Sequence, residues 1–122
     1  MNQVTFSESD FKNILETNLN EKKIVVLKFT AEWCGPCKRI KPCCEEFCKN
    51  MSKNILFYEI DVDESIELYI KFKKIKMVNS IPAILVYYPE VRDHWYVPND
   101  SCNTSDLNVL NGLFKRLNDK VE

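Results

Sequence analysis

Residues 24–38 read IVVLKFTAEWCGPCK, and this stretch decides the fold that the sequence predicts. Its first seven residues form a dense apolar run broken only by Lys28, which is typical of a strand buried on both faces of a parallel sheet. A helical pattern follows over about Pro36–Met51. Two cysteines, Cys34 and Cys37, therefore stand where a strand gives way to a helix.

That junction favours cysteine chemistry. The first amide groups of a helix have no partner within it, and the helix dipole places partial positive charge beside them. A thiolate is stabilised at such a place. Cys34 is thus positioned as an exposed nucleophile, and Cys37, one turn further on, can close a disulfide with it.

Strand and helix signals alternate along the rest of the chain. The other expected strands are Val4–Phe6, Ile55–Asp61, Ala83–Tyr88 and His94–Val97. The other expected helices cover about Glu8–Asn18, begin at Asp63 or Glu64, and begin at Ser105. This order implies an α/β fold, with a mixed sheet that is parallel where helices connect strands and ends in an antiparallel hairpin.

Composition limits the possible classes of protein. A chain of 122 residues fits a single domain covering 1–122. A formal net charge of -1, without a long block of like charge, gives no pull toward nucleic acid. The apolar runs are too short to span a bilayer, and the N-terminus has no signal-peptide pattern. We therefore expect a cytoplasmic protein that binds neither nucleic acid nor membranes.

Three further features establish a family resemblance. Ser80-Ile81-Pro82 follows WCGPCK by about 45 residues, Pro42 lies inside the helix after that motif, and Asp61-Val62-Asp63 closes a strand. With these residues the chain resembles the thioredoxin family over nearly its whole length. The resemblance implies one thioredoxin domain, a central mixed sheet of about five strands flanked by four helices.

The resemblance also implies an activity. Members of this family reduce protein disulfides by dithiol–disulfide exchange, with Cys34 as nucleophile and Cys37 as resolving cysteine. The substrate-binding residues that it implies are Trp33, Gly35, Pro36, Ile81 and Pro82, the last two joined by a cis peptide bond. We expect a monomer with a redox-active disulfide and neither metal nor other cofactor. Its partners would be protein disulfides and a thioredoxin reductase that supplies electrons from NADPH.

Lys28 is the main departure from the family, which usually has a buried aspartate at that position. Glu59 lies on the next strand, so the two side chains are expected to form a buried ion pair behind Cys37 and to act as a proton or charge relay. A lysine cation there would stabilise thiolates, whereas a neutral lysine could act as a base. The simpler hypothesis is that the Lys28 side chain extends to the edge of the sheet and has only a packing role.

Two alternative functions stay open at this point. A disulfide oxidase or isomerase is favoured if Lys28 raises the redox potential. A non-catalytic binding subunit would use the surface around Trp33 and Pro82 to hold a partner. Loss of insulin reduction on Cys34→Ser substitution separates an enzyme from a binding subunit.

The other four cysteines have a different setting. Cys43, Cys44 and Cys48 share the helix that follows the motif, and Cys44 and Cys48 are four residues apart. They could hold a metal or form a regulatory redox pair, but we favour free cysteines packed as small apolar side chains. Cys102 lies in a polar stretch and is expected to be exposed and open to intermolecular disulfide formation.

Overall fold

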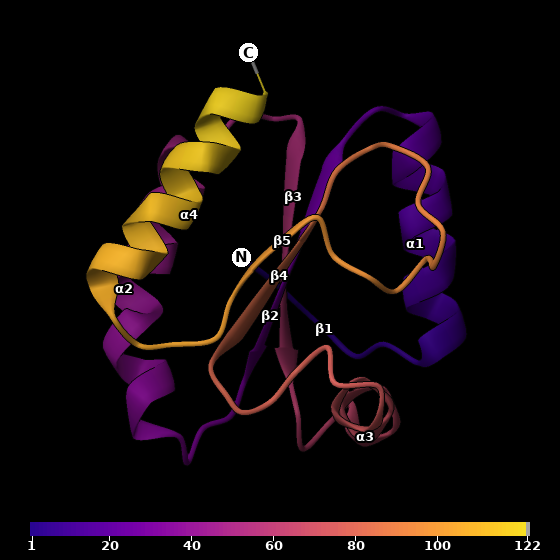
Figure 1. Ribbon diagram of the computed structural model, residues 1–122. Coiled ribbons are helices and arrows are strands. Elements are labelled where there is room, and N and C mark those ends of the chain that lie inside the picture. Colours follow the sequence, from indigo (N-terminus) through magenta and orange to yellow (C-terminus); the bar gives the residue numbers. More distant parts are fainter. Residues whose placement is uncertain (122) are drawn as a thin grey trace.

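In the computed structural model, which describes residues 1–121, a five-stranded sheet separates two pairs of helices (Figure 1). The strands are β1 (Asn2–Val4), β2 (Ile24–Thr30), β3 (Ile55–Asp61), β4 (Ala83–Tyr87) and β5 (Asp100–Cys102). The helices are α1 (Glu8–Asn20), α2 (Gly35–Asn50), α3 (Ile66–Lys74) and α4 (Leu107–Lys120). None of the helices described is both long and apolar enough to cross a lipid bilayer.

The sheet has the strand order β1-β3-β2-β4-β5. β3 runs parallel to both β1 and β2, whereas β4 runs antiparallel to both β2 and β5. The element order and the mixed sheet that the sequence predicts are therefore confirmed. β2 lies at the centre, and its C-terminal end leads directly into the cysteine motif.

The central strand β2 contributes to two separate cores because side chains alternate between the faces of a sheet. Val25 and Leu27 belong to the core beneath α1 and α3, whereas Ile24 and Val26 belong to the core beneath α2 and α4. Figure 1 shows the same division, with α1 and α3 on one face and α2 and α4 on the other. By this alternation Lys28 falls on the face that α2 and α4 cover.

The expected first strand was displaced along the chain. β1 comprises Asn2–Val4, and Phe6 instead enters the core, where its ring centroid lies 6.2 Å from that of Phe11. The sequence predicted that Phe6 lies in a strand, but its side chain packs in the core after the strand has ended. The shift brings Gln3 opposite Glu59 in the β1–β3 ladder.

The expected last strand was wrong. The fifth strand is Asp100–Cys102, and His94–Val97 lies in the connection from β4 to β5. The Trp95 ring lies 6.1 Å from the Phe11 ring and packs against the core under α1. Trp95 and Tyr96 pack against the core under α1 and α3. This packing outweighs the strand propensity of the segment.

Candidate active site

The two motif cysteines form a disulfide at the N-terminus of α2. Cys34 is the N-cap residue, and the backbone N–H of Cys37 donates a hydrogen bond of 3.2 Å to the Cys34 sulfur. Gly35 and Pro36 occupy the first helical positions, where the missing N–H of proline removes no helical hydrogen bond. The Cys34 sulfur therefore accepts a hydrogen bond from a backbone N–H group that has no partner within the helix.

A cis-proline loop lies over this disulfide. The Ile81–Pro82 peptide bond is cis, and the Ile81 carbonyl oxygen lies 3.9 Å from the Cys34 sulfur. The loop reaches the site because β4 begins at Ala83, which pairs with Phe29 near the end of β2. The antiparallel pairing of two strands therefore joins segments that are far apart in the sequence.

The disulfide is less exposed than the sequence indicated. Cys34 is only 5% exposed because its sulfur is turned into the disulfide and lies under the Ile81 carbonyl, so the expectation of an exposed cysteine was wrong. Trp33, in contrast, is 68% exposed, and its indole nitrogen donates a hydrogen bond of 2.8 Å to Asp63. The surface beside the disulfide therefore consists largely of an anchored tryptophan ring and the cis-proline loop.

Behind Cys37, Lys28 and Glu59 form a buried ion pair. They are direct neighbours in the β2–β3 ladder, and the Lys28 Nζ lies 3.2 Å from Glu59 Oε2. Their side chains are 1% and 7% exposed, so Lys28 does not reach water at the sheet edge. The other Glu59 oxygen, Oε1, accepts a hydrogen bond of 3.0 Å from the Gln3 amide.

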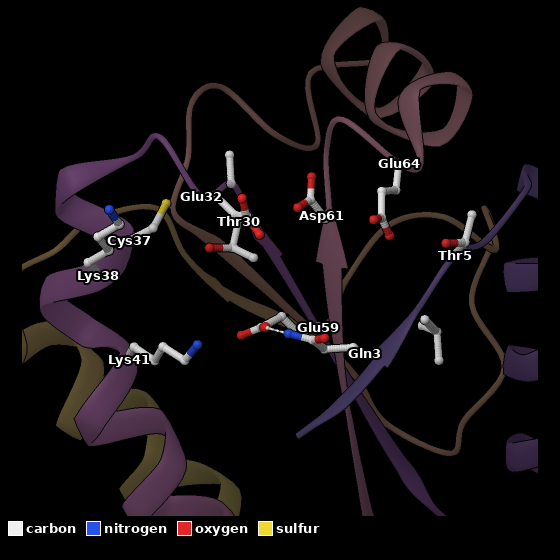
Figure 2. Close-up of a pocket in the computed structure, with 12 residues that line it drawn as sticks. Gln3, Thr5, Thr30, Glu32, Cys37, Lys38, Lys41, Glu59, Asp61 and Glu64 are labelled. Atoms are coloured by element: carbon white, nitrogen blue, oxygen red, sulfur yellow. Dashed lines mark hydrogen bonds between the residues drawn. The ribbon is translucent and has the colours of Figure 1, made fainter.

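The surroundings keep Glu59 ionised. Burial by itself raises the pKa of the Glu59 carboxyl. The hydrogen bond from Gln3 and the positive charge of Lys28 outweigh burial, so the pKa lies below its usual value. Lys41 adds a smaller effect in the same direction, and Figure 2 shows its side chain pointing from α2 toward Glu59.

A cleft of about 590 Å³ has both Glu59 and Cys37 in its wall. Cys37 lines it from α2, and Glu59 lines it from β3 (Figure 2). Polar side chains make up most of its wall, and its volume is many times that of a water molecule, about 30 Å³. The cleft is therefore large and polar enough to hold water beside Cys37 and Glu59.

The ion pair predicts how stability depends on pH. Because the pKa of Glu59 is lowered on folding, its contribution is fully present above the unfolded value, about 4.3, and is lost as pH falls through the folded value. Urea unfolding at several pH values should therefore show wild type exceeding Glu59→Gln by a constant margin near pH 7. That margin should shrink in acid below about pH 4. A margin that grows on acidification would contradict the assignment.

The four free cysteines have two kinds of environment. Cys44 lies on the buried face of α2, and burial raises its pKa to about 12. Cys102 is only 6% exposed, so its expected exposure was wrong: β5 turns it into the core under α4. Cys43 and Cys48 are half-buried on α2. Within residues 1–121, no group of three or more His, Cys, Asp or Glu side chains is arranged to hold a metal ion.

These environments predict an order of alkylation. With the disulfide intact, iodoacetamide should modify Cys43 and Cys48 first, because these two residues are only half-buried. Cys44 and Cys102 should resist until the protein unfolds, since only the exposed thiolate reacts. Peptide mass spectrometry of samples with and without urea provides the measurement. Early modification of Cys102 in native protein would show that the β5 edge opens readily.

Together, the fold and the site define a class: a dithiol–disulfide redox protein whose cysteine pair caps a helix beside a cis-proline loop. A family model described as Thioredoxin matches residues 2–104. The chain therefore belongs to the thioredoxin family, and it is a homologue of that family's thiol-disulfide oxidoreductases.

Individual relatives agree with this assignment. Thioredoxin 1 of Plasmodium falciparum (isolate 3D7) is 38% identical over 87 residues, which are 71% of this chain and 75% of that protein. Thioredoxin-1 of Caenorhabditis elegans is 41% identical over 71 residues, 58% of this chain and 59% of that protein. A solved structure of Plasmodium falciparum thioredoxin superposes with a TM-score of 0.69 at 29% identity, covering 95% of this chain and 98% of that chain.

Several site residues were not identified by sequence reasoning. Gln3 holds Glu59, Asp63 holds the Trp33 ring, and Asn103 binds the cis-proline loop. Their partners lie 56, 30 and 21 residues away along the chain, so no local pattern marks them. Only the pairing of strands brings them to the site.

Proposed function

We propose that this chain reduces disulfide bonds in other proteins. The observation that carries the proposal is the Cys34–Cys37 disulfide at the N-terminus of α2, with the Ile81 carbonyl 3.9 Å from Cys34. A helix N-terminus stabilises the attacking thiolate, and a neighbouring free backbone segment can align an extended substrate.

The proposed reaction has two exchange steps. In the reduced protein the Cys34 thiolate attacks one sulfur of a substrate disulfide, forming a mixed disulfide and releasing the other substrate sulfur as a thiolate, which takes up a proton. Cys37 then loses its proton and attacks Cys34, which restores the disulfide seen here and releases the second substrate thiol. Two electrons pass from the cysteine pair to the substrate, Cys37 releases one proton, and solvent supplies the second proton that the two substrate thiols need.

The substrate-binding role of the surrounding residues belongs to the same proposal. The exposed Trp33 ring offers an apolar contact on one side, and the Ile81 backbone, with the buried Pro82 behind it, offers an edge on the other. A side-chain carbon added at Gly35 would meet no atom within 4 Å, so the space above the motif is open. Pro36 fills the first turn beside it.

Lys28 and Glu59 are proposed to act as a charge relay for Cys37. Because the pKa of Glu59 is lowered, its carboxylate stays ionised at neutral pH and serves as counter-charge and hydrogen-bond acceptor. The proton of Cys37 would leave through the cleft that Cys37 and Glu59 line. The ion pair has no net charge. An unpaired lysine cation would favour an oxidase, so its neutralisation by Glu59 supports reduction of substrate disulfides.

The partners in this proposal are protein disulfides and a thioredoxin reductase that draws on NADPH. The test is reduction of insulin by catalytic amounts of wild-type protein in dithiothreitol, followed as precipitation of the B chain. NADPH consumption with a purified thioredoxin reductase measures recharging. A wild-type protein that does not accelerate insulin reduction refutes the enzyme and favours the binding subunit. Equilibration with glutathione buffers then distinguishes a reductase from an oxidant.

A further inference from the structure

Asn103 binds the cis-proline loop through its side-chain amide. Its Nδ2 donates hydrogen bonds of 2.7 Å to the Ser80 carbonyl and 2.9 Å to the Pro82 carbonyl, with a longer contact of 3.3 Å to the Ser80 hydroxyl. Its Oδ1 accepts a hydrogen bond of 3.3 Å from the Asn79 backbone N–H. One side chain thus holds the loop at three positions: 79, 80 and 82.

The position skipped in this set is Ile81, whose carbonyl faces the Cys34 sulfur. The carbonyls on either side of it are both held by Asn103, so they are not free to turn toward a bound chain. The middle carbonyl is the one left on the disulfide side. The asparagine therefore determines which backbone group of the loop is presented beside the reacting sulfur.

The sheet places Asn103 there. It follows β5 directly, and β5 pairs antiparallel with β4 so that Cys102 lies opposite Ile84. The residue after Cys102 consequently comes beside the residues before Ile84, which form the cis-proline loop.

We propose that Asn103 is a positioning residue that sets the cis-proline loop for pairing with an extended segment of a protein substrate. The inference rests on the proposed function and adds a specificity determinant to it. A folded or extended polypeptide needs the Ile81 backbone in a fixed orientation. A small aromatic disulfide such as 5,5′-dithiobis(2-nitrobenzoic acid) needs only an accessible thiolate. The loss should therefore fall on polypeptide substrates alone.

The experiment measures KM and kcat for insulin and the rate with the small disulfide, for wild type, Asn103→Ala and Asn103→Asp. We expect Asn103→Ala to raise the KM for insulin about three- to tenfold, the loss typical of one or two hydrogen bonds, with kcat and the small-disulfide rate unchanged. Asn103→Asp keeps the size of the side chain but replaces the donor by a carboxylate that faces two carbonyls. It should therefore raise KM at least as much.

The matched control is Asn99→Ala. The side chain of Asn99 is also fully engaged: it accepts a 2.8 Å hydrogen bond from the Tyr88 backbone N–H and donates one of 2.8 Å to Glu90. It lies at the other end of β4, away from the disulfide, so its loss should lower stability and leave the KM for insulin unchanged.

The outcomes separate the two proposals. Wild type inactive on both substrates overturns the proposed function and this inference with it. Wild type active, with an unchanged insulin KM in Asn103→Ala, overturns the role of Asn103 alone. Equal losses on insulin and the small disulfide in Asn103→Ala, or an equal rise in KM in Asn99→Ala, also overturn it, because they indicate general damage to the fold.

Discussion

Cys34→Ser will abolish insulin reduction, lowering the rate by on the order of 10³-fold or more, because an alkoxide cannot replace the thiolate in disulfide exchange. The fold should survive the change. Serine is a preferred N-cap residue, and its hydroxyl can accept the hydrogen bond from the Cys37 N–H that the sulfur now accepts. Turbidity of insulin, with a circular dichroism spectrum of the same sample, checks both statements.

Cys37→Ser is the matched control for this prediction. It also removes the disulfide, but it keeps the attacking sulfur at the N-cap, so it should form a mixed disulfide with substrate and fail to release it. Non-reducing electrophoresis and mass spectrometry of the trapped adduct would place the substrate on Cys34. If Cys37→Ser traps nothing and Cys34→Ser does, the two roles are reversed.

Lys28→Met will lower the free energy of unfolding by about 3–5 kcal/mol, the usual cost of removing one partner of a buried ion pair. Glu59 would then be left 7% exposed without its countercharge. The Gln3 hydrogen bond and the nearby Lys41 remain, so we expect the lower end of that range. Urea unfolding at pH 7 measures the change.

An exposed lysine–glutamate pair provides the control. Lys71 lies 3.9 Å from Glu8 with side chains 40% and 49% exposed, so Lys71→Met should cost less than about 1 kcal/mol. A double substitution, Lys28→Met with Glu59→Leu, should recover much of the lost stability because it removes the unpaired charge as well. Equal costs for Lys28→Met and Lys71→Met would show that burial does not strengthen the pair.

The same variant tests the charge relay. If Lys28 and Glu59 assist proton loss from Cys37, the pH profile of insulin reduction by Lys28→Met should shift relative to wild type. The shift should remain after correction for the fraction of folded protein at each pH. An unchanged profile removes Lys28 from the mechanism and leaves it as a structural residue only.

Most of the architecture could be predicted from the sequence because its signals are local. The apolar run of β2, the helical pattern of α2 and the cysteines between them each lie within a few residues of one another. The last strand could not be predicted, because distant packing contacts decided the structure of that segment. His94–Val97 has the composition of a strand, yet Trp95 was required as cover for the core under α1.

The candidate site shows the same division. The cysteine pair and the Ile81–Pro82 loop were recognisable from their motifs, and the pairing of Lys28 with Glu59 followed from the order of strands. The exposure of Cys34 could not be predicted, because it depends on a loop that arrives from a distant part of the chain.

The position of the cysteine pair followed from local sequence: Cys34 and Cys37 stand between an apolar strand pattern and a helical pattern. Only the tertiary structure decided what surrounds them. Strand pairing brings Glu59, Gln3 and Asn103 within hydrogen-bonding distance of their partners, from 21 to 56 residues away. Local propensities act over a few residues, whereas the charge behind a thiol and the loop above it are fixed by contacts that form only when the sheet does.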